Sequence, residues 1–142
     1  EIMYIHETKL KVRYVETDQM GVVHHSNYYV WFEVARTDFF EAIGLPYDRI
    51  EESGIMFPLI ESGCIYKEGA KYADNIIIKS CIKEIKGMKF TFLYDVIREK
   101  DNKLLAKGKT VHVPVDKDMN LINLKKVNPK LLEEIKNVVL TQ

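Results

Sequence analysis

The sequence has few cysteines, no excess charge of either sign and no long apolar run, and each absence excludes a class of protein. Its two cysteines, Cys64 and Cys81, have neither CxxC nor metal-ligand spacing, so we expect free thiols in a reducing cytoplasm. Lysine plus arginine and aspartate plus glutamate both number 21. Because no basic tail or basic helical face stands out, nucleic acid is not an expected partner.

No apolar stretch is long enough to span a bilayer, and the first residues lack the charged and then apolar pattern of a secretory signal. The chain contains no repeat, no low-complexity tract and no linker rich in proline, glycine or serine. With 46% hydrophobic and 30% charged residues, its composition is that of an ordinary globular protein. We therefore expect one soluble cytoplasmic domain over residues 1–142.

The first third of the chain predicts a strand followed by a long helix. Residues 8–16 alternate basic side chains with Leu10, Val12 and Tyr14, which indicates a strand with one solvated face. The segment from about residue 27 to residue 43 is apolar over most of its helical circumference. We expect other structure to enclose such a helix.

Local signals mark both ends of this helix and the elements that follow it. Ser26 is a good N-cap, and Gly44 with Pro46 forms a stop signal. Further along we expect a short helix at 46–54, strands at 55–67, 75–86, 89–99 and 103–116 with a hairpin turn at 100–102, and a closing helix at 128–140 that starts with Asn128 and Pro129. Strands in succession pair antiparallel. The sequence therefore predicts an α+β protein with the hot-dog fold, a curved antiparallel five-stranded sheet wrapped around one long central helix, with a C-terminal helix.

The segment between the first strand and the long helix carries a motif of known type. The stretch YVETDQMGVVHHSNYYVWFEVAR, residues 14–36, resembles the acyl-CoA thioesterases of the 4-hydroxybenzoyl-CoA thioesterase type, most closely their YbgC-like branch. The matching positions are Asp18, Gly21, Val23, His25 and the pairs Asn27–Tyr28, Phe32–Glu33 and Ala35–Arg36. The likeness continues more thinly through residues 57–80. His24 departs from the family, which usually has a larger apolar or aromatic residue there.

The resemblance implies a catalytic carboxylate at Asp18, an oxyanion donor in the backbone of His25, and a homodimer that often assembles further into a dimer of dimers. The residues point to the same chemistry. Thioester hydrolysis needs a base or a nucleophile and a site for the negative charge that develops on the carbonyl oxygen. A helix start offers unpaired N–H groups for that charge, and an ionised aspartate can take a proton from water or attack the carbonyl.

Each candidate also has a structural interpretation. Asp18 could hold an Asx turn before Gly21, and the imidazole of His25 could be structural. Adjacent histidines can suggest a metal, but neighbouring side chains on a regular element diverge and no third ligand is apparent, so we expect neither metal nor cofactor.

Further residues are expected around the substrate. Gly21, Val23, His24 and Tyr28 are candidates for its pocket, although Tyr14, Tyr28 and Tyr29 could equally be core. Glu61 ranks second after Asp18, as a residue that positions water, and Glu33 ranks third, with a salt bridge to Arg36 as its alternative role. The lysines that could bind coenzyme A phosphates are Lys71, Lys67, Lys86 and Lys89, each of which could equally be a solvated strand lysine.

The expected function is hydrolysis of an acyl-CoA thioester, and the acyl group is not specified by the motif. An acyl-carrier-protein thioester is an alternative substrate, and a non-catalytic acyl-thioester binding or regulatory module is an alternative function. A hot-dog regulator would carry an added DNA-binding segment, and an acyl dehydratase would show a different loop pattern; neither is found. Open sheet edges favour pairing with a second copy.

Overall fold

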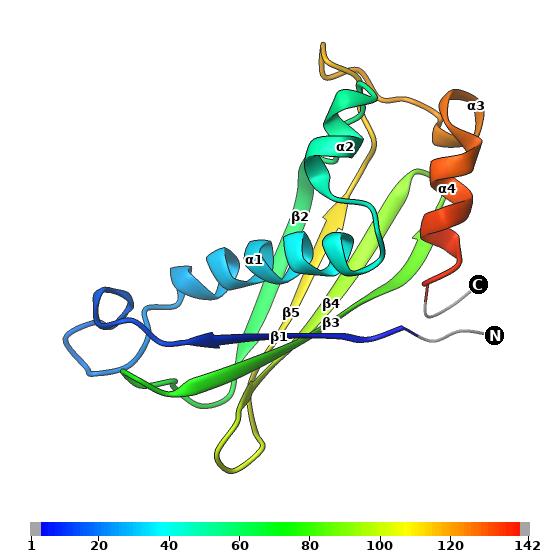
Figure 1. Ribbon diagram of the computed structural model, residues 1–142. Helices are drawn as coiled ribbons and strands as arrows, with labels where there is room; N and C mark the ends of the chain where they lie inside the picture. The colour runs from blue at the N-terminus through cyan, green and yellow to red at the C-terminus, as the bar shows by residue number, and fades with distance from the viewer. Residues whose placement is uncertain (1–3, 140–142) are drawn as a thin grey trace.

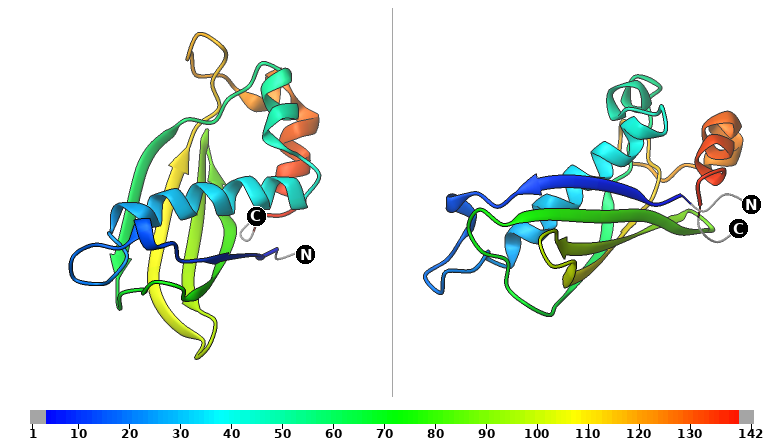
Figure 2. Two further views of the ribbon diagram at one scale, coloured as in Figure 1. Left: turned by 60° about the vertical axis from the view of Figure 1, so that its left-hand side comes forward. Right: turned by 60° about the horizontal axis from the view of Figure 1, so that its bottom comes forward.

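Five antiparallel strands form one sheet, and the long helix α1 lies across one face of it (Figure 1). The computed structural model describes residues 4–139. The strands are β1 (His6–Lys11), β2 (Leu59–Tyr66), β3 (Asn75–Lys86), β4 (Lys89–Arg98) and β5 (Lys103–His112), in the spatial order β1-β3-β4-β5-β2. The helices are α1 (Ser26–Ala42), α2 (Tyr47–Glu52), α3 (Leu124–Val127) and α4 (Pro129–Lys136), with a 3₁₀ turn η1 at Tyr14–Glu16. Figure 2 shows the sheet curving around α1.

The predicted order of elements is confirmed. All four strand pairs are antiparallel, and β4 and β5 are joined by the predicted hairpin, with Asn102 at a φ of 56°. The side chain of Asn128 accepts a hydrogen bond from the N–H of Leu131, so it caps α4 as expected. Cys64 and Cys81 are both free. The closing helix ends at Lys136 rather than at the predicted residue 140, and Leu140 itself lies outside the described residues.

Three local predictions are wrong. The first strand ends at Lys11 rather than at residue 16, because Val12 pairs its backbone with Ala73 and Asp74 and the chain then turns into η1. Ser26 is the first residue of α1 rather than its cap, and the residue at the cap position, His25, makes no capping hydrogen bond with its side chain. Helix α1 is not enclosed on all sides either.

The open side of α1 carries two apolar residues. Val30 and Val34 are 48% and 46% exposed, beside Glu33 and Glu41. The predicted salt bridge between Glu33 and Arg36 is not formed. This surface of α1 therefore faces away from the sheet in the single chain.

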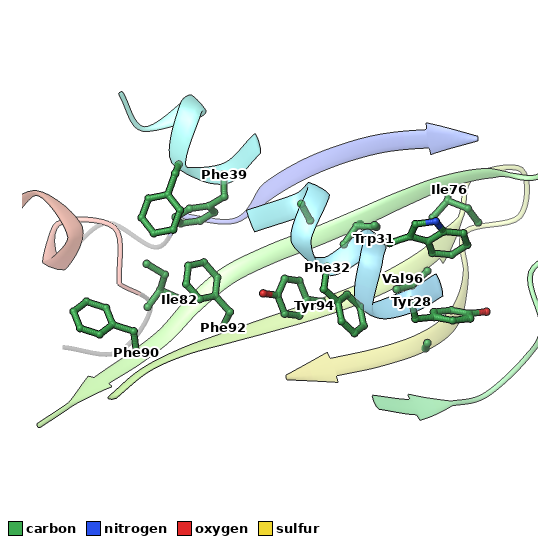
Figure 3. Packing of buried hydrophobic residues seen from close by; sticks show 14 of the residues in the cluster. Tyr28, Trp31, Phe32, Phe39, Ile76, Ile82, Phe90, Phe92, Tyr94 and Val96 are labelled. Carbon is green, nitrogen blue, oxygen red and sulfur yellow. The ribbon is translucent and has the colours of Figure 1, made fainter. Parts of the chain in front are cut away.

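The other side of α1 packs on the sheet through aromatic rings (Figure 3). Phe32 stacks on Tyr94 of β4 with ring centroids 4.4 Å apart, and Phe39 meets Phe92 edge to face at 5.5 Å. Gly108 of β5 lies directly under Phe32, where a Cβ atom would approach the ring to 2.2 Å. A glycine is therefore required there to let the helix approach the sheet this closely.

A chain of hydrogen bonds crosses this core from α1 to the segment before β2. Arg36 Nη1 donates to Tyr94 Oη at 3.1 Å, and Tyr94 Oη lies 2.7 Å from Thr110 Oγ1. Thr110 Oγ1 lies 3.0 Å from His112 Nε2, and His112 Nδ1 lies 3.1 Å from the carbonyl of Phe57. Because that carbonyl can only accept, Nδ1 must carry a proton, and in a neutral ring Nε2 then accepts from the hydroxyl of Thr110. The chain of bonds is therefore consistent with a neutral His112.

Burial, reinforced by the positive charge of Arg36, lowers the pKa of His112 from 6.5 to about 4. As the pH falls, the imidazole at position 112 therefore becomes protonated near pH 6.5 in the unfolded chain, but only near pH 4 in the folded chain. We expect the free energy of unfolding to fall by roughly 3 kcal/mol as the pH drops through this interval, and His112→Gln to abolish that part of the fall. Urea unfolding of both proteins across the interval checks this. Parallel pH profiles for the two proteins would contradict it.

Candidate active site

A tight loop carries Asp18 at the end of the sheet where α1 begins (Figure 1). Thr17 and Val23 form an antiparallel bridge, and the N–H of Asp18 donates to the carbonyl of Val22 at 2.8 Å. The N–H of Gly21 donates to the carbonyl of Asp18 at 3.0 Å, which closes a four-residue turn. Gly21 has a φ of +80°, a conformation that favours glycine. The loop is therefore closed at its base and has a defined shape.

The carboxylate of Asp18 is only half used by this turn. Its Oδ1 accepts the N–H of Met20 at 2.8 Å, which is the Asx turn that the sequence suggested. Its Oδ2 has no hydrogen bond to any residue from 4 to 139. The side chain is half-buried. One oxygen therefore orients the carboxylate, and the other is free to accept a proton or to attack.

The start of α1 presents one unused backbone donor. The N–H of Ser26 donates to His24 Nδ1 at 3.3 Å, that of Asn27 to the carbonyl of His24 at 3.0 Å, and that of Tyr28 to the carbonyl of His25 at 3.3 Å. The N–H of His25 finds no acceptor in the described part of the chain. It lies at the positive end of the helix dipole, which makes it a donor suited to an anion.

Glu16 holds the loop and the helix together. Its Oε1 accepts the N–H of Arg13 at 2.7 Å and its Oε2 accepts the indole N–H of Trp31 at 2.9 Å. Its backbone carbonyl accepts the N–H of His24 at 2.8 Å and the side-chain amide of Asn27 at 2.9 Å. Burial alone would raise the pKa of this carboxyl, but the bonds from Arg13 and Trp31 outweigh burial and lower it. Glu16 is therefore an ionised, buried anchor.

Two tyrosines and Val23 form the wall beside the helix start. Tyr28 is buried, meets Tyr66 of β2 edge to face at 5.1 Å, and accepts the N–H of Ala70 at 3.4 Å. The hydroxyl of Tyr66 donates to the carbonyl of His25 at 3.2 Å. Val23 is also buried, and its N–H donates to the carbonyl of Ala70 at 2.8 Å. The wall thus joins α1, β2 and the segment before β3.

The two adjacent histidines do not diverge as expected. Their rings lie 4.2 Å apart, because His24 belongs to the loop and not to the helix. His24 Nδ1 also lies 2.8 Å from Ser26 Oγ. Among residues 4–139, no three His, Cys, Asp or Glu side chains are grouped to hold a metal ion.

The other predicted residues lie away from Asp18. Glu61 is exposed on β2 and pairs with Lys109 at 2.9 Å, on the face of the sheet opposite α1, and this pairing lowers the pKa of its carboxyl. Glu33 is exposed on the outer side of α1. Lys71 is exposed in the turn before β3, where its N–H donates to Asp74 Oδ2 at 2.9 Å. Within the described chain, neither glutamate contacts the Asp18 loop.

Comparison with known proteins decides the family. The profile of the Thioesterase-like superfamily matches residues 12–137. A putative acyl-CoA thioesterase of Bacillus subtilis, YneP, is 33% identical over 116 residues, which cover 82% of this chain and 83% of the relative. The acyl-CoA thioesterase YbgC of Haemophilus influenzae is 30% identical over 105 residues, covering 73% and 75%. The chain belongs to the thioesterase-like superfamily.

The fold agrees with this assignment. A crystal structure of DHNA-CoA thioesterase from Staphylococcus aureus superposes with a TM-score of 0.88 and 30% identity, covering 94% of this chain and 89% of that one. The predicted hot-dog fold is thereby confirmed, and the class of activity is thioester hydrolysis. No described helix of this thioesterase is long and apolar enough to cross a membrane.

Two residues of the candidate site were not found from the sequence. Glu16 sits in a polar segment with no periodic signal, and its partner Trp31 is fifteen residues away on another element. Tyr66 ends a strand and reaches His25 across forty-one residues. Such long-range contacts leave no local pattern, so only the folded chain reveals them.

Glu16→Gln should lower the free energy of unfolding by about 1–3 kcal/mol, because the new amide N–H₂ must oppose either Arg13 N–H or the indole N–H. The same substitution should cost less in a Trp31→Phe background, which lacks the indole donor. Trp31 is the only tryptophan, so tryptophan fluorescence is lost in the Trp31→Phe background. Circular dichroism during urea unfolding is therefore the signal for the wild type, the two single variants and the double variant. Glu133→Gln, at an exposed site on α4, is the control. If Glu16→Gln lowered the free energy of unfolding equally in the wild-type and Trp31→Phe backgrounds, the proposed bond between Glu16 and Trp31 would not stabilise the protein.

Proposed function

We propose that the protein hydrolyses acyl-CoA thioesters at the start of α1, with Asp18 as base or nucleophile and the N–H of His25 as oxyanion donor. The observation that carries this proposal is that two reactive groups are left without a hydrogen-bond partner in the described chain. These are the free carboxylate oxygen of Asp18 and the free N–H of His25, on a loop and a helix start that Glu16 ties together. The relatives named acyl-CoA thioesterases support the substrate class.

In the direct route, the oxygen of a water molecule attacks the thioester carbonyl carbon while Asp18 takes a proton from that water. The electron pair of the C=O bond moves to oxygen, where the His25 N–H stabilises the negative charge. When the C=O bond re-forms, the C–S bond breaks and coenzyme A leaves as a thiolate that takes up the proton. In the alternative route, a carboxylate oxygen of Asp18 attacks the carbonyl carbon, the C–S bond breaks and coenzyme A leaves as a thiolate; water then hydrolyses the mixed anhydride and supplies the proton that the thiolate takes up. Both routes give a free acid and coenzyme A.

The remaining predicted residues have proposed roles around this centre. Gly21 shapes the loop, and Val23, His24 and Tyr28 border the acyl group. Lys71 belongs to the coenzyme A side of the site. Glu61 can reach Asp18 only across a subunit boundary, so its proposed role as a water-positioning residue depends on a second copy.

We propose a homodimer paired through β2. This strand is one edge of the sheet, and its residues Leu59, Ile60 and Ile65 are 49%, 51% and 65% exposed. In an antiparallel pair centred on the strand, the start of one β2 lies opposite the end of the other. Leu59 of one copy would then approach Tyr66 and the site of the other. The open outer side of α1 leaves a further surface for a dimer of dimers.

Asp18→Asn should lower thioesterase turnover by about 10²-fold or more, the scale of losing a general base. Asparagine keeps an Oδ1 for the N–H of Met20, so the turn and the melting temperature should change little. Free thiol release from a panel of acyl-CoA substrates measures turnover, with Glu33→Gln as a matched carboxylate control. Near-wild-type hydrolysis by Asp18→Asn, on a substrate that the wild type turns over well, would remove Asp18 from the mechanism.

A comparison of His25→Pro with His25→Ala isolates the oxyanion donor. Both remove the imidazole, but only proline removes the N–H, and His25 has a φ of −54° that proline can adopt. We expect His25→Ala to keep most of the activity and His25→Pro to lose about 10²–10³-fold in kcat relative to it. Circular dichroism and melting temperature establish that both variants fold. Equal kcat in two folded variants would exclude the His25 N–H as the donor.

A further inference from the structure

Four aromatic and apolar side chains are exposed on the Asp18 loop and on the segments beside it. Tyr14 and Val15 are each 77% exposed, Met20 81% and Tyr72 61%. We call these four residues the rim patch. Met20 is the residue whose N–H is held by Asp18, so the patch begins at the proposed catalytic loop itself. Such a cluster on a water-facing rim calls for a binding partner.

The fold brings two distant tyrosines together in this patch. The rings of Tyr14 and Tyr72 meet edge to face, with centroids 5.6 Å apart and planes at 87°. Their backbones are joined because the N–H of Val12 donates to the carbonyl of Asp74 at 2.9 Å, and the N–H of Ala73 to that of Val12 at 3.1 Å. Ala73 has a φ of 66°, an unfavourable conformation for alanine. The chain therefore accepts backbone strain in the turn that presents Tyr72.

A cation directly precedes each tyrosine. Arg13 stands before Tyr14 and Lys71 before Tyr72, so each of the two tyrosines that meet has a cation next to it in the sequence. Lys71 forms no ion pair within residues 4–139, and Arg13 reaches only Glu16, at 3.4 Å. Two lysines on the outer face of the sheet, by contrast, pair with carboxylates: Lys107 with Asp95 at 2.8 Å and Lys109 with Glu61 at 2.9 Å. Lys71 is therefore available to a ligand, and the side chain of Arg13, although paired with Glu16, is 68% exposed.

We propose that the rim patch with Arg13 and Lys71 binds the adenosine 3′,5′-bisphosphate end of coenzyme A. A purine ring stacks on the open ring faces, and its phosphates meet the two cations. Since the pantetheine arm separates the nucleotide from the thioester, the nucleotide must bind outside the Asp18 loop, and Tyr14 and Tyr72 belong to η1 and to the turn before β3 rather than to that loop. The proposal rests on the proposed function and deepens it. It names acyl-CoA rather than an acyl-carrier protein as the substrate, because a carrier protein's arm has no purine ring.

The direct test is binding of adenosine 3′,5′-bisphosphate by calorimetry, which needs no turnover. Tyr72→Ala should weaken binding by about tenfold, the scale of losing one base–aromatic stack, and Tyr72→Phe should restore it. Lys71→Ala should weaken binding and reduce its salt dependence, whereas Lys130→Ala, an exposed lysine on α4, should change neither. Wild-type affinity in both Tyr72→Ala and Lys71→Ala would overturn the proposal.

Kinetics separate this proposal from the proposed function. For an acyl-CoA, Tyr72→Ala should raise KM by about tenfold at unchanged kcat. For the same acyl group on N-acetylcysteamine, which lacks the nucleotide, KM should not change. Asp18→Asn should abolish turnover but bind the nucleotide normally. Wild-type hydrolysis of both esters with no effect of Tyr72→Ala would overturn the nucleotide site and leave the proposed function standing. Nucleotide binding without hydrolysis of either ester would overturn the proposed function and leave the nucleotide site standing.

Two other occupants of the rim patch are outcomes of the same experiments. If the patch were a contact with a second copy of the chain, Tyr72→Ala would lower the mass measured by light scattering. If it held a carrier protein, Tyr72→Ala would raise KM for an acyl-carrier-protein substrate and not for acyl-CoA. Either result would overturn the nucleotide site.

Discussion

The candidate site depends on one buried carboxylate, that of Glu16. It is 3% exposed, yet its side chain and carbonyl accept bonds from Arg13, His24, Asn27 and Trp31. An ionised group can be buried only when its lone pairs are satisfied, and here the donors come from both η1 and α1. Satisfying Glu16 therefore fixes the start of α1 against the end of η1. The Asp18 loop is the chain between these two fixed points, so its shape follows from theirs.

The same helix start is also fixed to the sheet. Phe32 lies over Gly108 and stacks on Tyr94, while the hydrogen bonds from Arg36 to Phe57 cross the core beneath it. At the first residues of the helix, the hydroxyl of Tyr66 on β2 donates a hydrogen bond to the carbonyl of His25. A donor that stabilises charge in a transition state must be oriented before the reaction begins. The proposed oxyanion donor is on a rigid helix held by contacts at several points, which meets that requirement.

Much of this fold could be predicted from the sequence because its strands alternate regularly and its helix ends carry local signals, as at Asn128. The errors have a common physical cause. Residues 12–16 continue the alternating pattern, but Val12 pairs with the turn at 73–74 and the chain leaves the sheet. The roles of Glu16 and Tyr66, and the contact between the two histidine rings, likewise depend on elements far apart in the sequence. Sequence patterns report on residues that are close along the chain, so they do not predict contacts that depend on how distant segments fold together.

For Asp18, the turn and the proposed catalytic role are compatible rather than competing. A carboxylate has two oxygens, and the Asx turn uses only Oδ1. The bond to Met20 removes rotational freedom from the carboxylate, so the free Oδ2 is held in one orientation without loss of its lone pairs. The same bond fixes the backbone of Met20, whose side chain stands on the rim beside the loop. The bond from the N–H of Met20 to Asp18 Oδ1 thus supports the turn, orients the proposed base and positions the backbone of one residue of the rim patch.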